Sequence, residues 1–301
     1  MIRRDWREPN FRCCAIDRHG RRRSWLAVGA SADDVRERIE RRRWSDGRVE
    51  AYTFDEWRNR AQLAIALADR RRADDEAEPH RGGIWGELKQ HLFELFDGKC
   101  AYCESRVQHV DHGTVDHYRP KGAVHGEPSH PGYHWLSHEP ENLLPACGLC
   151  NETGKRTRFP VRDGTRAHRP ADLAREQPLL LSPYRDAPQE HLRFLPRGDV
   201  AGITDRGDET IELCQLRRLE AQREAAQEQL ETDLWIEAAR ERSFREVCLK
   251  RLDVLLEGEE EYSAALVDHL LHLLDEQERE TAAGARAAHE TLRGHRTLPP
   301  N

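Results

Sequence analysis

The sequence predicts an α+β protein that is mostly helical and is built on a frame of four zinc-binding cysteines, with helices on either side. Three observations predict this class. Two Cys-x-x-Cys motifs are present, Cys100 with Cys103 and Cys147 with Cys150. Residues 100–160 are dense in His, Cys, Gly and Pro, which is typical of a small module organised by a metal. From Asp208 nearly to the end, apolar residues recur with the period of amphipathic helices.

The four cysteines have the composition of a structural zinc site. Four thiolates fill the tetrahedral coordination of Zn²⁺ and leave no open position, so such an ion holds the fold together and does not react. Paired cysteines in a chain without a secretion signal indicate metal binding rather than disulfides. The alternative is four unrelated buried thiols. Residues 104–146 separate the two motifs, so a further element is inserted between the two halves of the site.

The composition limits the partners that the chain can attract. The chain has 301 residues, of which 37% are hydrophobic and 34% charged, and its formal net charge is -7. A net negative charge repels nucleic acid at long range, so contact with it requires a local basic patch. The sequence begins without an apolar leader, and no stretch approaches the roughly 18 apolar residues of a membrane span. We therefore expect a cytoplasmic protein that does not enter a membrane.

The inserted segment carries the residue types needed to hydrolyse a phosphodiester bond. In "VDHYRPKG" the alternation of a strand would place Asp116 and His117 on opposite faces. His117 has an ordinary pKa near neutrality and can deprotonate water. Asp116 and Asn151 offer hard oxygen ligands for a divalent cation. Asn142 can hold the imidazole in one orientation through side-chain or backbone contacts.

Basic side chains flank this segment on both sides and are candidates for contacting the phosphate backbone. They are Arg119, Lys121, Lys155, Arg156 and Arg158. Each would supply local positive charge within a chain that is negative overall.

These motifs carry a family resemblance. The pattern "CAYCE…VDHYRPK…YHWLSHEPENLLPACGLCN…K…FP" resembles the HNH (His-Me finger) nucleases. It looks most like the branch associated with retron and Septu-type bacterial anti-phage systems, and "TRAHRPADLAREQPLLLSPYRDAPQEHLRF" and "DETIELCQLRRLEAQR" resemble the same branch. The resemblance spans roughly residues 85–223.

The resemblance implies a fold and a role for each matching position. The fold is a ββα-metal (HNH) core, with Asp116 and His117 on its hairpin and Asn151 at the head of its helix. Asp116 and Asn151 would hold a catalytic Mg²⁺, or another divalent cation such as Mn²⁺ or Ni²⁺, and His117 would be the general base. Asn142 is the central Asn of the motif, and the four cysteines match the structural zinc pair of the family. Relatives in defence systems act with an ATPase, which implies a similar partner here.

The sequence departs from the family pattern at two positions. Asn151 stands where some members have His, and the amide is a weaker metal ligand than imidazole. "CNETGK" places Lys155 one residue later than the common Cys-Asn-x-x-Lys form, so its contact with phosphate is less secure.

Three regions are predicted along the chain. Residues 1–80 form a helical or irregular region with helices at 31–44 and 53–72, and the polar stretch 73–83 is a linker. Residues 81–165 form the nuclease core with its structural zinc, and residues 166–301 form a largely helical region.

The predicted function is that of a metal-dependent HNH endonuclease that acts on nucleic acid, with DNA expected over RNA, as the effector of an anti-phage system. The alternative is a non-catalytic zinc module that binds nucleic acid or a partner protein. The four cysteines alone would support that module, but it leaves Asp116, His117 and Asn151 without a role. A zinc hydrolase is disfavoured because an all-thiolate site has no open position.

Overall fold

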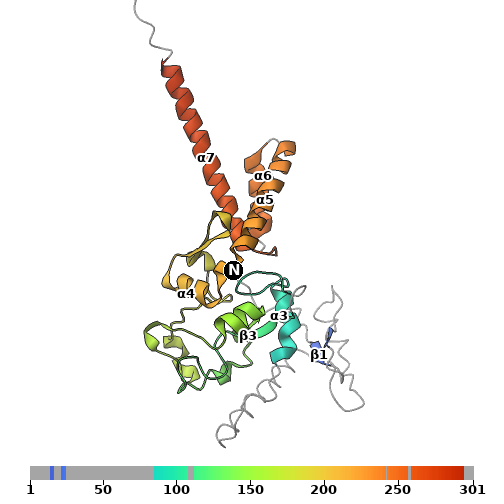
Figure 1. Ribbon diagram of the computed structural model, residues 1–301, viewed down its shortest axis with the longest axis vertical. Helices are drawn as coiled ribbons and strands as arrows, with labels where there is room; N and C mark the ends of the chain where they lie inside the picture. The colour runs from blue at the N-terminus through green and yellow to red at the C-terminus, as the bar shows by residue number, and fades with distance from the viewer. Residues whose placement is uncertain are drawn as a thin grey trace, which may run out of the picture. The chain divides into compact units, whose positions relative to one another are not determined.

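The computed structural model describes residues 85–107, 112–241, 243–256 and 259–294, together with two short strands near the N-terminus (Figure 1). Strands β1 (Cys14–Ile16) and β2 (Arg22–Ser24) pair antiparallel. The predicted helices at 31–44 and 53–72 and the predicted linker at 73–83 lie outside the described residues. Contacts divide the chain into two units. The first extends to Leu192 and includes Ala201–Leu216, and the second comprises Arg193–Val200 and the chain from Arg217 onward.

The first unit begins with a short helix that delivers the chain to the first cysteine motif. A 3-10 turn, η1 (Trp85–Leu88), leads into α3 (Lys89–Leu95). The helix ends where the sequence predicts, because Gly98 adopts φ +74° and its amide donates to the carbonyl of Phe93 at 2.7 Å. Glycine takes this left-handed conformation without the steric cost of a Cβ, which makes it the usual helix stop.

A two-stranded antiparallel sheet lies at the centre of the first unit. β3 (Thr114–His117) pairs with β4 (Leu143–Ala146), and Asp116 lies opposite Leu144 in the register. All four residues of β4 are buried. Since β4 runs directly into the second cysteine motif, the sheet fixes the candidate residues of β3 against that motif.

Short helical elements make up most of the remaining first unit. The π-helix η4 (Leu149–Lys155) follows β4, and α4 (Asp205–Leu213) packs against it. A Cβ on Gly154 would lie 2.6 Å from the carbonyl oxygen of Leu213, so only glycine allows this approach. The connecting 3-10 helices are His134–Leu136, Pro140–Asn142, Arg162–Gly164, Pro170–Arg175 and Pro188–Glu190.

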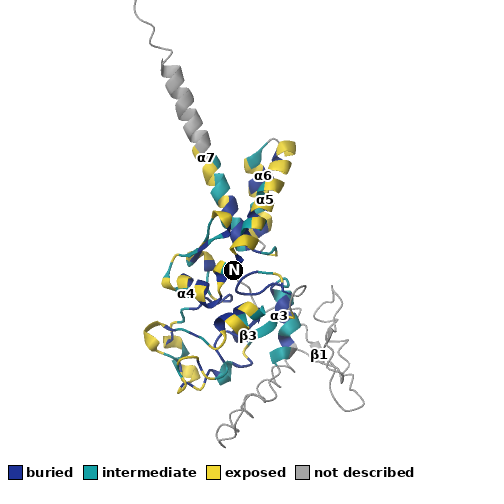
Figure 2. Ribbon diagram, viewed as in Figure 1, coloured by how far each residue is buried: buried dark blue, intermediate teal, exposed yellow. Residues whose placement is uncertain are grey.

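The second unit is a helical bundle. Helices α5 (Glu220–Glu241), α6 (Phe244–Leu256) and α7 (Ser263–Gly294) pack on one another, and buried positions alternate with exposed ones along α5 and α6 (Figure 2). Their shared core consists of Leu230, Leu234, Ala238, Val247, Cys248, Leu255, Leu266 and Leu270. The amphipathic pattern that predicts long helices after Asp208 is therefore confirmed for the described residues.

A hairpin precedes the bundle. β5 (Leu192–Phe194) and β6 (Val200–Gly202) form a two-stranded sheet, joined by the turn η8 (Pro196–Gly198). Arg197 and Gly198 both adopt positive φ, at +61° and +76°. A Cβ on Gly198 would lie 2.0 Å from the carbonyl oxygen of Glu220, so the turn can approach α5 only through a glycine.

The mostly helical character with small sheets is thus confirmed. The chain after residue 165 belongs to the first unit up to Leu192. The cause is visible at Glu176, which is buried and accepts hydrogen bonds from Arg119 and Tyr133. Among the described residues, none of the helices combines the length and the apolar character that a bilayer crossing requires.

Candidate active site and metal centre

The four cysteines of the two motifs converge in the first unit, and we refer to Cys100, Cys103, Cys147 and Cys150 as the cysteine cluster. Their sulfur atoms all lie within 4.8 Å of one another, and Cys103 and Cys147 are 3.9 Å apart. Sulfur atoms bound to one tetrahedral Zn²⁺ at 2.3 Å are about 3.8 Å apart. The cluster therefore has the donors and the spacing to hold such a metal ion. The alternative of four unrelated thiols is excluded by this convergence.

The backbone of each motif forms a tight loop around its cysteines. In the first, the amide of Cys100 donates to the carbonyl of Ser105 at 3.0 Å, and Glu104 turns the chain with φ +61°. In the second, the amide of Cys150 donates to the sulfur of Cys147 at 3.4 Å. Hydrogen bonding among the clustered thiols, from Cys100 first, holds the pKa of Cys147 well below its ordinary value. A thiolate is the form that binds Zn²⁺.

The cysteine cluster is joined to the central sheet at two points. The amide of Ala101 donates to the carbonyl of Pro145 on β4 at 2.9 Å. The hydroxyl of Tyr102 donates to Oδ2 of Asp116 on β3 at 2.6 Å, and both residues are buried. Burial and the neighbouring carboxylate raise the pKa of Tyr102 well above its ordinary value, so it remains a donor. Tyr102 was not a candidate in the sequence, where an aromatic residue between two cysteines indicates only packing.

Asp116 is held on its other side by Lys155. The ammonium of Lys155 lies 3.0 Å from Oδ1 of Asp116 and 2.7 Å from the carbonyl oxygen of His117. Lys155 is completely buried, so in this structure it does not face solvent as a phosphate-binding residue would. Each oxygen of Asp116 thus accepts one hydrogen bond from the protein and keeps further lone pairs for a ligand.

The π-helix explains how Lys155 reaches Asp116 despite its shifted position in the sequence. η4 contains the five residues that follow Cys150, one more than the common spacing to the lysine. The amide of Arg156 donates to the carbonyl of Asn151, five residues earlier, at 2.6 Å. A π-helical turn accommodates one additional residue relative to an α-helix, and such turns are frequent at functional sites.

The imidazole of His117 is oriented by a backbone carbonyl. Its Nε2 lies 2.9 Å from the carbonyl oxygen of Ser137, which can only accept, so Nε2 carries the proton and Nδ1 carries the lone pair of the neutral ring. Trp85 packs edge-on against the ring at 5.2 Å. Burial, and then the positive charge of Lys121, hold the pKa of His117 well below its ordinary value of 6.5. The ring is therefore neutral near neutral pH.

Asn142 was predicted to hold that imidazole through side-chain or backbone contacts, and the contacts of its side chain are with backbone groups. Its side chain accepts from the amide of Arg119 at 2.8 Å and donates to the carbonyls of Arg119 and Leu136, each at 3.1 Å. It thereby fixes the chain directly after His117 and the turn that leads to Ser137. Its effect on the imidazole is indirect, through the backbone.

Asn151 lies on the same side of β3 as Asp116. Its Nδ2 donates to the hydroxyl of Thr114 at 2.9 Å, and Thr114 is two residues from Asp116, so their side chains leave the same face of the strand. This hydrogen bond occupies the amide nitrogen and leaves the oxygen of Asn151 as the end that could bind a cation. Asn151 lies within η4, near its first turn, where the sequence places it at the head of a helix.

The remaining basic candidates differ in how accessible they are. Arg119 is buried and its guanidinium pairs with Glu176 at 2.7 Å, so it is already engaged within the protein. Lys121 is half-buried, with its ammonium 4.7 Å from the centre of the Trp85 ring. Arg158 is half-buried and donates to the carbonyl of Gly154, whereas Arg156 is exposed. Lys121, Arg156 and Arg158 therefore remain the accessible cations of the predicted set.

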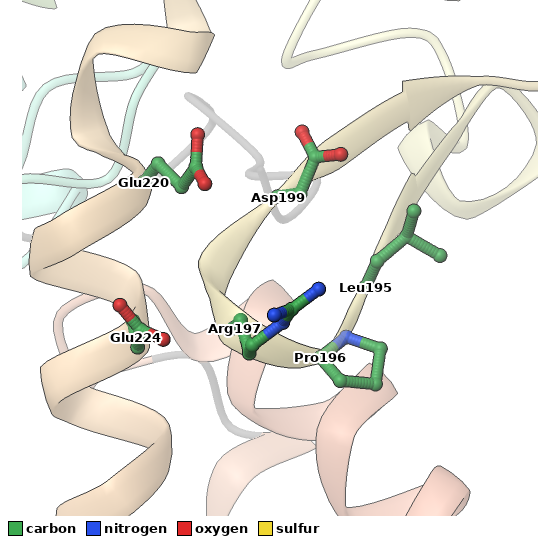
Figure 3. A pocket seen from close by; sticks show the side chains of 6 residues that line it. All are labelled: Leu195, Pro196, Arg197, Asp199, Glu220 and Glu224. Atoms are coloured by element: carbon green, nitrogen blue, oxygen red, sulfur yellow. The ribbon is translucent and has the colours of Figure 1, made fainter.

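A separate cavity lies in the second unit and contains none of the predicted site residues. It has a volume of about 560 Å³ and opens between the η8 turn and the start of α5 (Figure 3). It is lined by Leu195, Pro196, Arg197, Asp199, Glu220 and Glu224. Three carboxylates and one guanidinium give this cavity a negative lining, which does not suit a phosphate.

Comparison with known proteins supports the resemblance in part. Over 146 residues the chain is 36% identical to a Septu protein PtuB of Bacillus mycoides, covering 46% of this chain and 50% of that protein. It is 37% identical over 140 residues to a Septu protein PtuA of the same organism, covering 44% of this chain and 19% of PtuA. A PtuB of Bacillus thuringiensis is 27% identical over 140 residues, or 46% of this chain and 44% of that protein.

The chain thus spans about half the length of the PtuB relatives it matches, and less of PtuA. All three relatives are Septu proteins, the type of system that the sequence motifs indicated. No protein-family model matches the chain, and no solved structure matches it.

Proposed function

We propose that this chain is a metal-dependent HNH endonuclease that hydrolyses phosphodiester bonds in nucleic acid, with DNA as the expected substrate, and that it acts in bacterial defence against phage. The observation that carries the proposal is the imidazole of His117. It is neutral, its tautomer is set by the carbonyl of Ser137, and it follows Asp116 on the strand that the cysteine cluster holds in place. A base poised in this way suits the removal of a proton from water.

The donor set near Asp116 fits a hard divalent cation such as Mg²⁺, Mn²⁺ or Ni²⁺. Asp116 and Asn151 would offer one carboxylate and one amide oxygen, and ions of this kind complete their coordination with water and phosphate oxygens. When bound, such an ion neutralises charge that develops on the phosphate and on the leaving oxygen. The cysteine cluster would hold Zn²⁺ as a structural ion, since four thiolates leave no position for a substrate.

His117 would act directly on the attacking water. The oxygen of the water forms a bond to phosphorus while one of its protons passes to Nδ1 of His117. The bond from phosphorus to the 3′-oxygen breaks, and that oxygen takes a proton from solvent. The products carry 5′-phosphate and 3′-hydroxyl ends, and the imidazolium returns its proton to water.

The role in defence rests on the relatives. Two of the matched proteins are PtuB and one is PtuA, so Septu systems have at least two different components. We propose that this chain also acts with a second protein, for which the sequence resemblance implies an ATPase. The net charge of -7 agrees with a nuclease that needs such a partner to engage nucleic acid.

Replacing His117 by alanine is expected to reduce cleavage by about 10²–10⁴-fold, because the base is lost, while the fold is kept. The assay would use plasmid and single-stranded DNA with Mg²⁺, Mn²⁺ or Ni²⁺ and the partner protein present. His130→Ala is a matched control, since His130 is also buried and also contacts a backbone carbonyl, that of Ala167, at 3.1 Å. If His117→Ala cuts as well as the wild type, the assignment is wrong.

A second function is favoured by one specific observation. Both oxygens of Asp116 are engaged by Tyr102 and Lys155, and such a network would also serve as a purely structural core. The chain would then be a non-catalytic zinc module that binds nucleic acid or a partner protein. Retention of DNA or partner binding together with an absence of cleavage under every metal tested would favour this module over the nuclease.

A further inference from the structure

The residues around Asp116 carry no net negative charge that would attract a cation on its own. The buried ammonium of Lys155 contacts the carboxylate at 3.0 Å and neutralises it. Asn151 is an uncharged amide, and the imidazole of His117 contributes no negative charge. The carboxylate is thus the one negative group among these four residues, and its charge is already balanced.

A second ammonium adds positive charge beside this group. Lys121 lies over the ring of Trp85, which also packs against His117. Burial lowers the pKa of Lys121, and the charge of Asp116 raises it while that of Lys155 lowers it, so all three groups are within electrostatic reach of one another. With both lysines protonated, two positive charges face one carboxylate. These charges therefore favour an anion over a divalent cation.

We propose that a divalent ion at Asp116 and a phosphodiester beside Lys121 bind cooperatively, each weakly alone and more tightly together. The inference rests on the proposed nuclease function and specifies how its metal site is regulated. The phosphate supplies negative charge in place of the Asp116 charge that Lys155 balances. The half-buried Lys121 can contact this phosphate. The ion would then meet a net negative set of ligands only when nucleic acid is present, so that metal loading follows substrate.

Lys155 is the residue that sets this coupling. Since it is completely buried and bonded to Asp116 and to the carbonyl of His117, it acts through Asp116 and is a positioning residue rather than a phosphate ligand. Without its charge, Asp116 would present a full negative charge to a cation. Coupling between two ligands is reciprocal, so the effect of Mn²⁺ on nucleic-acid affinity equals the effect of nucleic acid on Mn²⁺ affinity.

The test measures binding in a His117→Ala background, in which the oligonucleotide stays intact. With the partner protein present, fluorescence anisotropy gives the affinity for a labelled duplex of about 20 base pairs with and without Mn²⁺, and electron paramagnetic resonance of free Mn²⁺ gives the metal affinity without DNA. We expect Mn²⁺ to tighten duplex binding by about tenfold. Adding Lys155→Met should tighten Mn²⁺ binding without DNA by about tenfold and reduce the coupling.

Lys89→Met is the matched control. Lys89 is a lysine of the same unit whose ammonium donates to the carbonyl of Gly113 at 2.6 Å, so its removal should leave Mn²⁺ affinity at Asp116 unchanged. A second measurement, which does not depend on the folding of the Lys155 variant, is the thermal unfolding midpoint of the His117→Ala protein. Mn²⁺ should raise it markedly only when the duplex is present, because a ligand stabilises the state that it binds.

The two hypotheses fail in different ways. If the wild-type chain cleaves in a metal-dependent manner but Mn²⁺ binds equally with and without duplex, the coupling is wrong and the nuclease assignment stands. If Lys155→Met folds and binds Mn²⁺ no more tightly than its parent, the role of Lys155 is wrong. If the wild type neither cleaves nor binds Mn²⁺ with its partner and DNA present, the proposed function itself fails.

Discussion

Replacing Cys147 by serine is expected to unfold the first unit and to abolish stoichiometric zinc. The four sulfur atoms lie within 4.8 Å of one another, and serine is a far weaker ligand for Zn²⁺ than a thiolate. Structural zinc sites contribute free energy on the order of 10 kcal/mol, which is comparable to the whole stability of a domain. The loss of one ligand should therefore be seen as lost secondary structure and not only as lost activity.

The measurement combines metal analysis of the purified protein with circular dichroism and thermal unfolding. Cys248→Ser is the control, because Cys248 is a buried cysteine in the core of the helical bundle and is not part of the cysteine cluster. That control should lose only about 1–3 kcal/mol from burying a hydroxyl and should retain its zinc. A Cys147→Ser protein with wild-type zinc content and an unchanged thermal midpoint would contradict the structural role of the cluster.

The same substitution should also disturb the candidate active site, because the two are physically joined. Tyr102 lies inside the first cysteine motif and contacts Asp116, and Ala101 contacts β4. Loss of the metal from the cysteine cluster should therefore free Tyr102, which holds the carboxylate of Asp116. This link between a structural ion and a reactive site follows from the sequence order, since Cys100 and Cys103 precede β3, and Cys147 directly follows β4.

Motif spacing and hydrophobic periodicity were sufficient to predict much of the fold. The paired cysteines predicted the cluster, the stop at Gly98 predicted the end of α3, and the turn at Arg197 and Gly198 predicted the β5–β6 hairpin. Each of these features depends on local chemistry, such as a ligand pair or a residue with positive φ. Local chemistry is visible in a sequence without knowledge of the tertiary path.

The contacts of the candidate residues could not be predicted in the same way. The carbonyl of Ser137 orients His117 across twenty residues, and Glu176 engages Arg119 across fifty-seven. Such partners depend on how the chain between them folds back, and any carbonyl or carboxylate would look equally suitable in the sequence. The burial of Lys155 could not be predicted for a related reason. In the sequence, the π-helical turn that directs Lys155 inward looks the same as an exposed basic loop.

Asp116→Ala is expected to destabilise the first unit by about 3–5 kcal/mol, in addition to any loss of cleavage. The substitution leaves the completely buried ammonium of Lys155 without its carboxylate, and an unpaired buried charge is strongly unfavourable. The hydroxyl of Tyr102 also loses its acceptor. An inactive Asp116→Ala protein would therefore not by itself show that Asp116 binds a metal.

The double variant Asp116→Ala/Lys155→Met separates the two effects. It removes both charges together, and methionine fills much of the volume of the lysine chain, so we expect it to be more stable than Asp116→Ala by about 2 kcal/mol in urea unfolding. Cleavage should be absent from both variants if Asp116 serves the reaction. Equal stability of the single and double variants would show that the two side chains are not energetically paired. A stable double variant that still cleaves DNA would instead show that the reaction does not need the carboxylate of Asp116. Asp116 would then serve only to support the fold.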